Sequence, residues 1–411
     1  MTQISVLGLG YVGLPSAAVF ANSGLTVIGV DVDEMVVETI NSGRAHIVEP
    51  GLDALLQKVV GNRSLRASTQ VEASDVFVIA VPTPFKEGKA PDLKYVKSAA
   101  DMIAPLLASG NLVILESTSP VGATEQLAGW LQDARPDLDI PEMGSVEGDI
   151  GLAYCPERIL PGNVIQEVVE NDRVIGGITP NSSAMAVQFY QHAVKGECHV
   201  TNSRTAELCK LSENSFRDVN IAFANELSVI SAKLGVDVYE LIALTNRHPR
   251  VNILQPGTGV GGHCIAVDPW FIVDTAPEEA RLIRTAREVN DAKPHWVVDQ
   301  VVRLARDFDN PVIACMGLAY KPNVDDLRES PSVEVVQILH DLNFGQIKLS
   351  EPYVTALPQS LIDRGLQNHD IDSAIADADI IVFLTAHDHF LRIGEEAKTN
   401  AQIFDACGLT R

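Results

Sequence analysis

A glycine fingerprint near the start of the chain constrains its fold most strongly. The segment Ile4-Ser-Val-Leu-Gly8-Leu-Gly10-Tyr-Val-Gly13 begins as a strand-like run and leads directly into a helix-like one. In this arrangement Gly8 permits a tight turn, Gly10 lets the backbone approach a pyrophosphate, and Gly13 allows close helix–strand packing. The pattern predicts a dinucleotide-binding turn, with a purely structural glycine turn as the alternative.

An acidic residue follows at the position that usually binds the adenosine ribose. Asp31 ends the next apolar run, Thr26–Val30, and lies eighteen residues after Gly13. A carboxylate here accepts hydrogen bonds from the ribose hydroxyls and disfavours a 2′-phosphate. The sequence therefore predicts NAD rather than NADP as the cofactor.

Strand-length apolar runs alternate with helix-length segments in both ends of the chain, whereas Thr205–Leu244 has a helical composition without proline. The alternation predicts an α/β fold with two Rossmann-like, doubly wound parallel-sheet domains joined by a long central helix or helix pair. We expect boundaries at 1–203, 204–300 and 301–411. The predicted strands are Ile4–Leu7, Thr26–Val30, Val76–Val81, Leu112–Leu115, Leu152–Tyr154, Pro311–Gly317, Ile347–Leu349 and Ile380–Leu384.

Charge and composition exclude several classes of partner. The formal net charge is -23 over 411 residues, so the chain repels nucleic acid and anionic membranes, and we expect neither as a partner. The longest apolar runs are too short to span a bilayer, and strand-like sequence from Ile4 leaves no room for a signal peptide. Six dispersed cysteines without a CxxC pair predict reduced thiols in a cytoplasmic protein.

Two segments follow strands that should end at the cofactor crevice. They are Val81-Pro-Thr83-Pro84 and Glu116-Ser-Thr118-Ser-Pro-Val-Gly122. In a doubly wound sheet these positions allow Thr83 and Thr118 to hydrogen-bond cofactor or substrate. The equally weighted alternative is that threonine and proline only shape the turns.

Polar side chains recur on one face of the expected central helix. Lys210, Asn214 and Arg217 share a narrow face, and Glu207 precedes them by one turn. Such a stripe is usually a solvated surface. Here the apolar run Ile221–Phe223 predicts a buried helix, in which amines and amides need partners or a function.

A glycine-rich segment ends in a cysteine. It runs from Gly257 through Gly261 and Gly262 to Cys264, with Asp268 four residues later. Glycine-rich backbone can wrap closely around a substrate, and nearby cations or a helix N-terminus can activate a thiol. An inert core cysteine is the alternative, which we expect for Cys155, Cys198, Cys209 and Cys315.

Two histidines, His387 and His389, have a spacing found in metal ligands, but no third ligand lies at a suitable distance along the chain. We therefore expect a loop there rather than a metal centre.

Several motifs, in order, resemble those of the UDP-glucose/GDP-mannose dehydrogenase family over essentially the whole chain. The runs NRHPRVNILQPG, GGHCIAVDPWFIV and RTAREVND are most similar to the branch acting on UDP-N-acetylmannosamine. The family motifs are GLGYVGLP at Gly8–Pro15, VPTP at Val81–Pro84, ESTSPVG at Glu116–Gly122, YCPER at Tyr154–Arg158, ELCKLSENSFRDVN at Glu207–Asn220, GVGGHCIAVDP at Gly259–Pro269 and GLAYKPNVDDLRESP at Gly317–Pro331.

The resemblance implies an NAD-dependent, four-electron oxidation of the sugar C6 hydroxyl to a carboxylate, for surface polysaccharide biosynthesis. Cys264 would carry a thiohemiacetal and then a thioester, which prevents escape of the aldehyde. Lys210 would stabilise an oxyanion or shuttle a proton, and Asn214 and Asp268 would position groups or water. Glu157 is the candidate base for the hydrolytic water.

The same resemblance implies two sets of binding residues. Those expected at NAD are Gly8, Gly10, Tyr11, Val12, Gly13, Asp31, Thr83, Thr118 and Arg328. Those expected at the UDP-sugar, in part from a neighbouring subunit, are Arg158, Ile159, Lys210, Asn214, Arg217, His248, Arg250, Gly261, Tyr320 and Lys321. Many relatives carry a nucleotide-binding arginine near Cys407; here Arg411 is the candidate substitute.

The alternatives are the same chemistry on UDP-N-acetylglucosamine, UDP-glucose or GDP-mannose, a one-step NAD alcohol dehydrogenase, and a non-catalytic NAD-binding protein. The family resemblance also implies a homodimer or higher homo-oligomer through the central helix.

Overall fold

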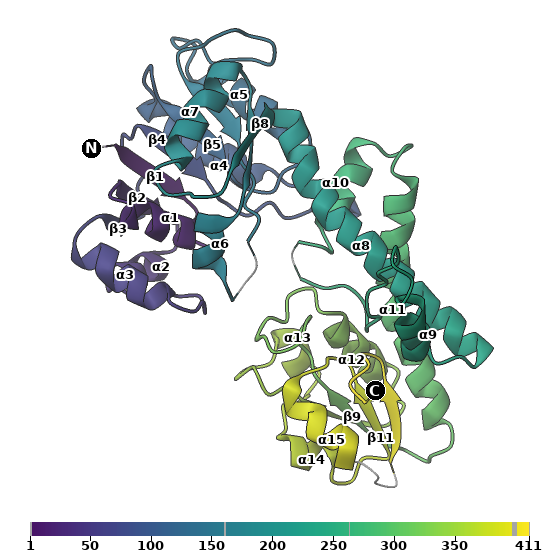
Figure 1. The fold of residues 1–411 in the computed structure, drawn as a ribbon. Helices are drawn as coiled ribbons and strands as arrows, with labels where there is room; N and C mark the ends of the chain where they lie inside the picture. The colour runs from purple at the N-terminus through teal and green to yellow at the C-terminus, as the bar shows by residue number, and fades with distance from the viewer. Residues whose placement is uncertain (1, 160–161, 263, 397–400, 411) are drawn as a thin grey trace. The chain divides into compact units, whose positions relative to one another are not determined.

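The computed structural model describes residues 2–159, 162–262, 264–396 and 401–410 (Figure 1). The chain forms two compact units. Unit 1 comprises Met1–Ser212 and Trp270–Thr275, and unit 2 comprises Glu213–Pro269 and Ala276–Arg411.

Unit 1 is built on one eight-stranded sheet of order β3-β2-β1-β4-β5-β6-β7-β8. Neighbouring strands are parallel except β6 and β7, which are antiparallel. The strand order reverses between β1 and β4, which is where such sheets bind dinucleotides. The strands are β1 (Gln3–Leu7), β2 (Thr26–Val30), β3 (Leu65–Ser68), β4 (Val76–Ile79), β5 (Leu112–Leu115), β6 (Gly151–Tyr154), β7 (Arg173–Gly177) and β8 (Cys198–Asn202).

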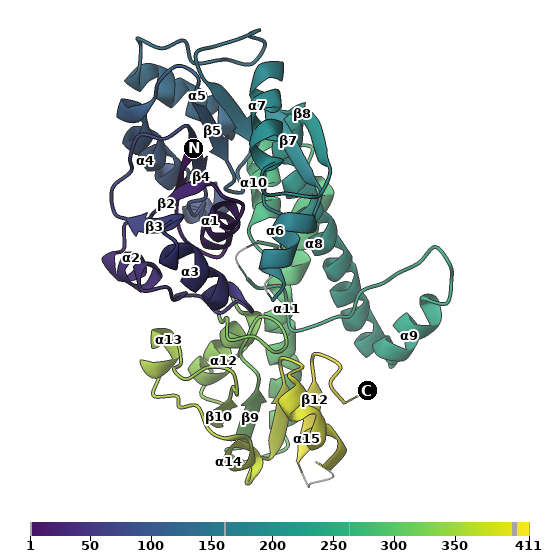
Figure 2. The ribbon, with the colours of Figure 1, turned by 60° about the vertical axis from the view of Figure 1, so that its left-hand side comes forward.

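Helices cover both faces of this sheet, so its central strands are buried and mostly apolar (Figure 2). Ile4 and Val6 pack with α1, α3 and α7, whereas Phe77 and Ile79 pack with α4 and α5. The helices are α1 (Gly13–Asn22), α2 (Glu34–Asn41), α3 (Leu52–Gly61), α4 (Lys94–Ile103), α5 (Ala123–Ala134), α6 (Val164–Glu170) and α7 (Pro180–Tyr190), with 3-10 turns η1 (Glu87–Lys89) and η2 (Ala104–Leu106).

Unit 2 contains a four-stranded, fully parallel sheet of order β10-β9-β11-β12. One of its apolar faces packs against α11 and α12, and the other against α14 and α15. The elements are β9 (Val312–Met316), β10 (Gln346–Ser350), β11 (Ile380–Phe383), β12 (Gln402–Asp405), α11 (Arg281–Ala305), α12 (Pro331–Asp341), α13 (Gln359–Ile362), α14 (Ile371–Ile375), η3 (Asp388–Phe390) and α15 (Leu391–Glu396).

The expected central helix is a helix pair. The 32-residue α8 (Ser203–Leu234) is followed by α9 (Val238–Thr245), and the break lies at Gly235, which has φ +69°. Asp237 caps α9 by accepting hydrogen bonds from Tyr239 and Glu240. The next helix is α10 (Asp268–Thr275). The predicted fold class, two parallel-sheet domains with a long central helix, is confirmed.

One expectation for α8 is wrong. Phe223 was expected in a buried stretch, but its side chain is 52% exposed, while the neighbouring Ala222 is buried. The helix is buried along a polar seam and exposes apolar side chains elsewhere. Among the described helices, none combines the length and apolarity needed to cross a bilayer.

Candidate active site

Each of the three fingerprint positions is occupied by glycine for a different structural reason. Gly8 has φ +90°, and a Cβ there would lie 2.7 Å from the carbonyl oxygen of Ala80. A Cβ on Gly13 would lie 1.9 Å from the Gly8 carbonyl oxygen. Gly10, by contrast, has no atom within 4 Å of such a Cβ. Two glycines therefore close the turn, and the third leaves open space into which a pyrophosphate can fit.

Asp31 is joined to the same turn. Its carboxylate accepts hydrogen bonds from the backbone N–H of Leu9, at 3.0 Å, and of Asp33, at 3.1 Å. These bonds hold the carboxylate at the end of β2, beside the fingerprint. The acidic group and the open Gly10 backbone fit the ribose and pyrophosphate of NAD.

The loops after β4 and β5 are bonded to each other. The hydroxyl of Thr83 donates to the carbonyl oxygen of Thr118 at 2.5 Å, and Ser117 donates to the carbonyl oxygen of Val81 at 2.7 Å. Glu207 of α8 holds the second loop by accepting from the backbone N–H groups of Gly122 and Thr124 at 2.6 and 2.8 Å. This carboxylate caps the start of α5.

A buried cluster of ionisable groups lies where β5 and β6 end. Arg173 donates to Glu157 at 2.8 Å, and its guanidinium lies 3.9 Å from Glu116. The hydroxyl of Tyr190 donates to Glu116 at 2.7 Å. Burial and the charge of Glu157 raise the pKa of Glu116 to about 7, against the opposing effects of Arg173 and Tyr190. One guanidinium thus faces two carboxylates, and burial favours a proton on Glu116.

Two predicted sugar-binding residues follow this cluster. The backbone N–H of Arg158 donates to Glu157 at 3.0 Å, and its carbonyl oxygen accepts from Asn171 at 3.0 Å. Ile159 packs against the apolar side of α6. The described part of this segment ends there and resumes at Gly162.

In unit 2 a seam of buried polar side chains runs along α8. Asn214 donates to Asp268 at 2.5 Å. One turn later, Asp218 accepts from Arg287 at 2.6 Å and from Asn290 at 2.8 Å.

Asn225 continues this seam. It donates to Asn290 at 2.9 Å and accepts from the backbone N–H of Gly257 at 2.9 Å. The seam therefore connects α8 to α11 and to the start of the glycine-rich segment. Lys210 is half-buried and Arg217 exposed, so the three residues predicted to share a face differ in burial.

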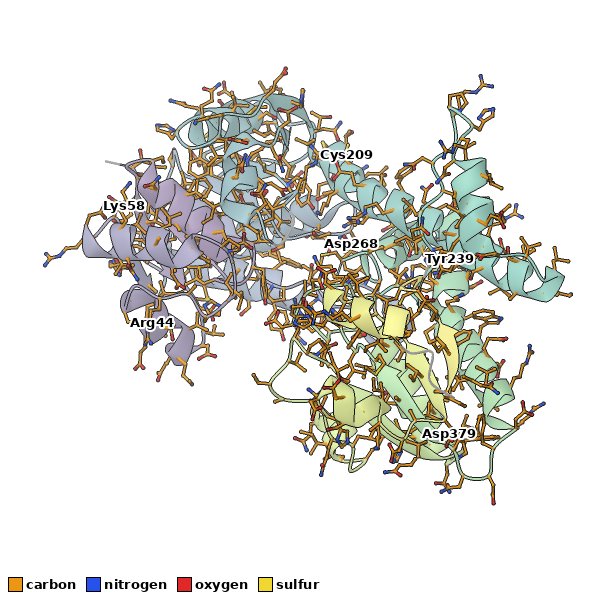
Figure 3. The ribbon with its side chains drawn as sticks, turned by 60° about the horizontal axis from the view of Figure 1, so that its bottom comes forward. Arg44, Lys58, Cys209, Tyr239, Asp268 and Asp379 are labelled. Carbon is orange, nitrogen blue, oxygen red and sulfur yellow. The ribbon has the colours of Figure 1, made fainter. Side chains whose placement is uncertain are left out.

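Cys264 is the exposed member of the six cysteines; Cys155 and Cys315 are buried, and the others are half-buried. Its carbonyl oxygen accepts from the backbone N–H groups of Val267 and Asp268, at 3.0 and 2.8 Å. Cys264 therefore lies on a closed turn before α10. The first residue of α10, Asp268, is labelled in Figure 3. Burial raises the pKa of the Cys155 and Cys315 thiols to about 12, which makes these two inert.

The 317–331 segment packs against the two glycines before Cys264. A Cβ on Gly261 would lie 2.8 Å from the Tyr320 Cβ, and one on Gly262 would lie 3.0 Å from the Tyr320 ring. The backbone N–H of Gly262 also donates to the carbonyl oxygen of Arg328 at 3.1 Å. Tyr320 and the glycines preceding Cys264 therefore share one packed region, and Lys321 lies 5.8 Å from the Tyr320 ring centre.

Tyr11 and Val12 directly precede α1 in unit 1, and Val12 is its N-cap residue. The other predicted residues lie elsewhere on unit 2. His248 and Arg250 are exposed, and the backbone N–H of Arg250 donates to the His248 ring at 3.4 Å. Arg328 forms an ion pair with Asp326 at 2.6 Å. Arg411 lies outside the described residues.

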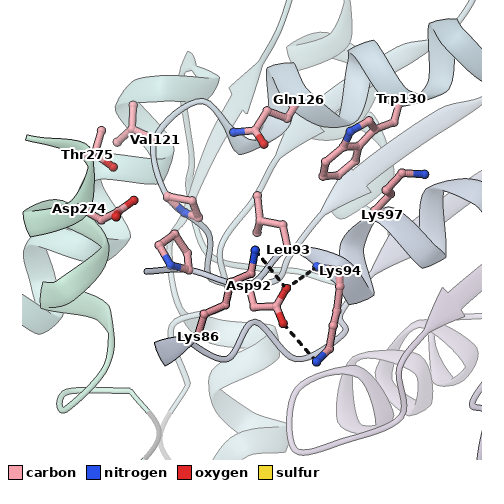
Figure 4. A pocket seen from close by; sticks show the side chains of 12 residues that line it. Lys86, Asp92, Leu93, Lys94, Lys97, Val121, Gln126, Trp130, Asp274 and Thr275 are labelled. Atoms are coloured by element: carbon pink, nitrogen blue, oxygen red, sulfur yellow. Dashed lines mark hydrogen bonds and ion pairs between the residues drawn. The ribbon is translucent and has the colours of Figure 1, made fainter. Parts of the chain in front are cut away.

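A separate pocket of about 350 Å³ lies in unit 1 between the loops that precede α4 and α5 (Figure 4). Its lining includes Trp130 and Lys97, together with Lys94, which pairs with Asp92 at 3.1 Å. None of the residues predicted to bind cofactor or substrate lines it. Within the described ranges, no group of three or more potential metal ligands occurs.

The sequence did not identify Glu116, Arg173, Asp218 or Asn225 as parts of these clusters. For Asp218 and Asn225 a signal was available, because they continue the face of Glu207 and Asn214 at helical spacing. Arg173 and Glu116 carry no such local signal, since the fold alone brings them together.

Unit 1 has a Rossmann-type sheet with a dinucleotide-binding turn, and unit 2 contains a second parallel sheet and the exposed Cys264. These features define a two-domain, dinucleotide-dependent dehydrogenase. Comparisons with known proteins agree. The domains of the UDP-glucose/GDP-mannose dehydrogenase family match in order: the NAD binding domain at residues 2–194, the central domain at 204–292 and the UDP binding domain at 314–411.

Full-length relatives are similar to this chain. An NDP-N-acetyl-D-galactosaminuronic acid dehydrogenase of Ralstonia nicotianae is 57% identical, over 99% of this chain and 96% of its own. A UDP-N-acetyl-D-mannosamine dehydrogenase of Salmonella typhi is 56% identical, over 100% and 99%. The solved structure of a UDP-D-ManNAc dehydrogenase from Pyrococcus horikoshii has a TM-score of 0.89 at 37% identity, covering 100% of this chain and 96% of that one.

The chain belongs to the UDP-glucose/GDP-mannose dehydrogenase family. It is an NAD-dependent UDP-sugar dehydrogenase.

Proposed function

We propose that the protein oxidises the C6 hydroxyl of UDP-N-acetyl-D-mannosamine to the carboxylate of UDP-N-acetyl-D-mannosaminuronate, with Cys264 as covalent nucleophile. The observation that carries the proposal is the placement of Cys264. It is an exposed thiol on a closed turn, directly after a glycine-rich segment and four residues before a buried, hydrogen-bonded carboxylate. Nucleophilic thiols need exposure and a fixed position, and both are present.

Gly8, Gly10, Gly13 and Asp31 would hold NAD, with Tyr11, Val12, Thr83, Thr118 and Arg328 as further contacts. Two NAD molecules, bound one after the other, would each supply the hydride acceptor for one of the two oxidations. The residues of the chain carry out the remaining chemistry. Lys210 would stabilise the oxygen of the substrate as its hydroxyl proton leaves.

Cys264 would then act on the aldehyde. Its thiolate forms a C–S bond to C6 while the carbonyl oxygen takes up a proton, giving a thiohemiacetal. Loss of the second hydride and of the hydroxyl proton gives a thioester. Water adds to the thioester carbon, the C–S bond breaks, and the carboxylate and free thiol result. Glu157 would accept the proton of that water, and Asn214 and Asp268 would position the reacting groups.

The uridine diphosphate and sugar require local cations, since the chain carries a net charge of -23. Arg158, Arg217, Arg250 and Lys321 are the candidates, with His248, Ile159, Gly261 and Tyr320 as further contacts. The six dispersed cysteines, which include no CxxC pair, support action in the cytoplasm, where thiols stay reduced. The product would serve surface polysaccharide biosynthesis.

A second copy of the chain is the proposed partner of α8. Phe216, Phe223, Ile230 and Leu234 recur on one side of this helix and are 70%, 52%, 45% and 68% exposed. An exposed apolar stripe of this length is typical of an interface. Phe223→Glu should give a monomer in sedimentation equilibrium, whereas Lys233→Glu, off the stripe, should not. A monomeric parent protein would contradict the proposed dimer.

The substrate is tested by counting NADH formed per sugar consumed. The panel contains UDP-N-acetylmannosamine, UDP-N-acetylgalactosamine, UDP-N-acetylglucosamine, UDP-glucose and GDP-mannose. We expect the highest kcat/KM with UDP-N-acetylmannosamine and two NADH per sugar. The 57% identical relative named for N-acetylgalactosaminuronic acid makes the galactosamine the strongest competitor. One NADH per sugar would indicate a simple alcohol dehydrogenase, and none a binding protein.

A further inference from the structure

We propose that His387 and Glu351 are positioning residues for the nucleotide sugar, because they fix both ends of the short loop that carries Tyr320 and Lys321. This inference rests on the proposed role of those two residues in sugar binding. Neither His387 nor Glu351 was expected to have a function from the sequence.

Glu351 binds the beginning of the loop. One carboxylate oxygen accepts from the backbone N–H groups of Leu318 and Ala319, at 2.6 and 2.9 Å. Its other oxygen accepts from the N–H of Tyr353 at 3.0 Å. Glu351 is 2% exposed, so these charge-assisted bonds form away from water, where they are strong.

His387 binds the end of the loop. Its Nδ1 accepts from the backbone N–H of Asn323 at 2.9 Å, and its Nε2 lies 3.0 Å from Glu351. Since a backbone N–H can only donate, Nδ1 must be unprotonated, and Nε2 donates to the carboxylate. The imidazole is fully buried. One continuous chain of hydrogen bonds thus runs from Leu318 through Glu351 and His387 to Asn323.

The charge of Glu351 is stabilised within this chain. Burial alone would raise the pKa of the Glu351 carboxyl, but hydrogen bonds from His387 and the backbone lower it overall. Glu351 therefore remains ionised and keeps accepting all of its bonds at neutral pH.

The end of the loop has a left-handed backbone conformation that side-chain hydrogen bonds hold in place. Asn323 has φ +60°, an uncommon conformation for a residue with a side chain. Its side-chain oxygen accepts from the Tyr353 hydroxyl at 2.9 Å and from the N–H of Asp388 at 3.0 Å. Only three residues separate the bonded amides of Ala319 and Asn323. Tyr320 and Lys321 therefore have little freedom.

The fixed loop in turn contacts the glycines before Cys264. Tyr320 would meet a side chain at either Gly261 or Gly262. A shift of the loop would therefore alter the position of the proposed sugar contacts relative to the cysteine turn. Loss of His387 should weaken binding of the nucleotide sugar and leave NAD binding unchanged.

Two substitutions separate the bonds of His387. His387→Asn places an amide oxygen near the former Nδ1 and can still accept from Asn323, whereas His387→Gln places an amide N–H near the former Nε2 and can only serve Glu351. His389→Gln is the control, since His389 is exposed and contacts the edge of the Tyr353 ring. The measurements are the Kd of UDP by calorimetry, the KM of NAD, and the unfolding midpoint.

We expect the Kd of UDP to rise about tenfold in His387→Gln, which loses the acceptor for the loop amide of Asn323, and by less than about threefold in His387→Asn, which keeps that acceptor. The KM of NAD and the control should be unchanged. A folded His387→Gln protein that binds UDP like the parent would overturn the proposal, as would failure of both variants to fold. UDP binding needs no turnover, so a wrong substrate or mechanism for the enzyme would not produce either result.

Discussion

The amide of Asn214 donates to the carboxylate of Asp268 at 2.5 Å, which joins the middle of α8 to the first residue of α10. Both side chains are buried, at 8% and 3% exposure. The bond fixes the residue that lies four positions after Cys264, and the backbone N–H of Asp268 in turn binds the Cys264 carbonyl oxygen. The cysteine turn is thereby connected to α8.

Exchange of the Asn214 and Asp268 side chains separates their contribution to stability from their contribution to catalysis. Asn214→Asp would oppose two buried carboxylates, and we expect a loss of about 2 kcal/mol or more in the free energy of unfolding. The double variant Asn214→Asp/Asp268→Asn restores one donor and one acceptor and should recover most of that loss in urea unfolding. Acid production should not recover, because the carboxylate has moved. A double variant as unstable as Asn214→Asp would contradict a stabilising hydrogen bond between residues 214 and 268.

Glu116 should make the stability of the protein fall as the pH rises. Burial and the neighbouring Glu157 raise the pKa of Glu116 from 4.5 to about 7, so between these values the folded state holds a proton that the unfolded state has lost. The stabilisation is complete below pH 4.5 and is lost as the pH rises through 7. Glu116→Gln lacks this titration. Its free energy of unfolding relative to that of the parent should therefore increase as the pH is raised from 5 to 8.

The measurement is urea unfolding at both pH values, with the exposed Glu38→Gln as control. The difference should not exceed about 1.4 kcal/mol per pH unit. Equal pH dependence in Glu116→Gln and the parent would contradict the assignment of the proton.

Lys293 should have the opposite pH dependence. Burial lowers the pKa of Lys293 from 10.5 to about 7; its amine bonds to Ser228 and lies 3.9 Å from the Trp296 ring centre. Between these values the unfolded state holds the extra proton, so stability is present above pH 10.5 and is lost as the pH falls through 7. The free energy of unfolding of Lys293→Met, relative to that of the parent, should therefore increase when the pH is lowered from 9.5 to 7.

Thermal or urea unfolding at these two pH values tests this expectation, and Lys233→Met, an exposed lysine of α8, serves as control. If Lys293→Met and the parent change in parallel, Lys293 is charged in the folded state and the expectation fails.

The sequence predicted the interior of the fold better than its edges. Strands such as β4 and β5 are buried on both faces and therefore form continuous apolar runs. The edge strands β3 (LRAS) and β8 (CHVTN) alternate or are largely exposed, so they lack this signal and were not predicted. The terminal strand β12 was missed for the same reason, as it is only partly buried.

The candidate site was predictable where its groups are close in sequence. The reasons inferred for Gly8 and Gly13 agree with the backbone contacts at these residues. The partners of Asp218, by contrast, are Arg287 and Asn290, about seventy residues away. A helical pattern can indicate that Asp218 faces inward, but no local pattern indicates which side chain it meets. Only the packing of α8 against α11 provides that information.

The central claim is that Cys264 carries the sugar as a thioester, and the most direct test is the mass of the Cys264 peptide from enzyme quenched in acid during turnover with NAD and UDP-N-acetylmannosamine. We expect an added nucleotide-sugar acyl group on that peptide, no such mass on the half-buried Cys407, and no acid production by Cys264→Ala. Acid formed at the parent rate by Cys264→Ala, with no adduct on the parent peptide, would contradict covalent catalysis by Cys264.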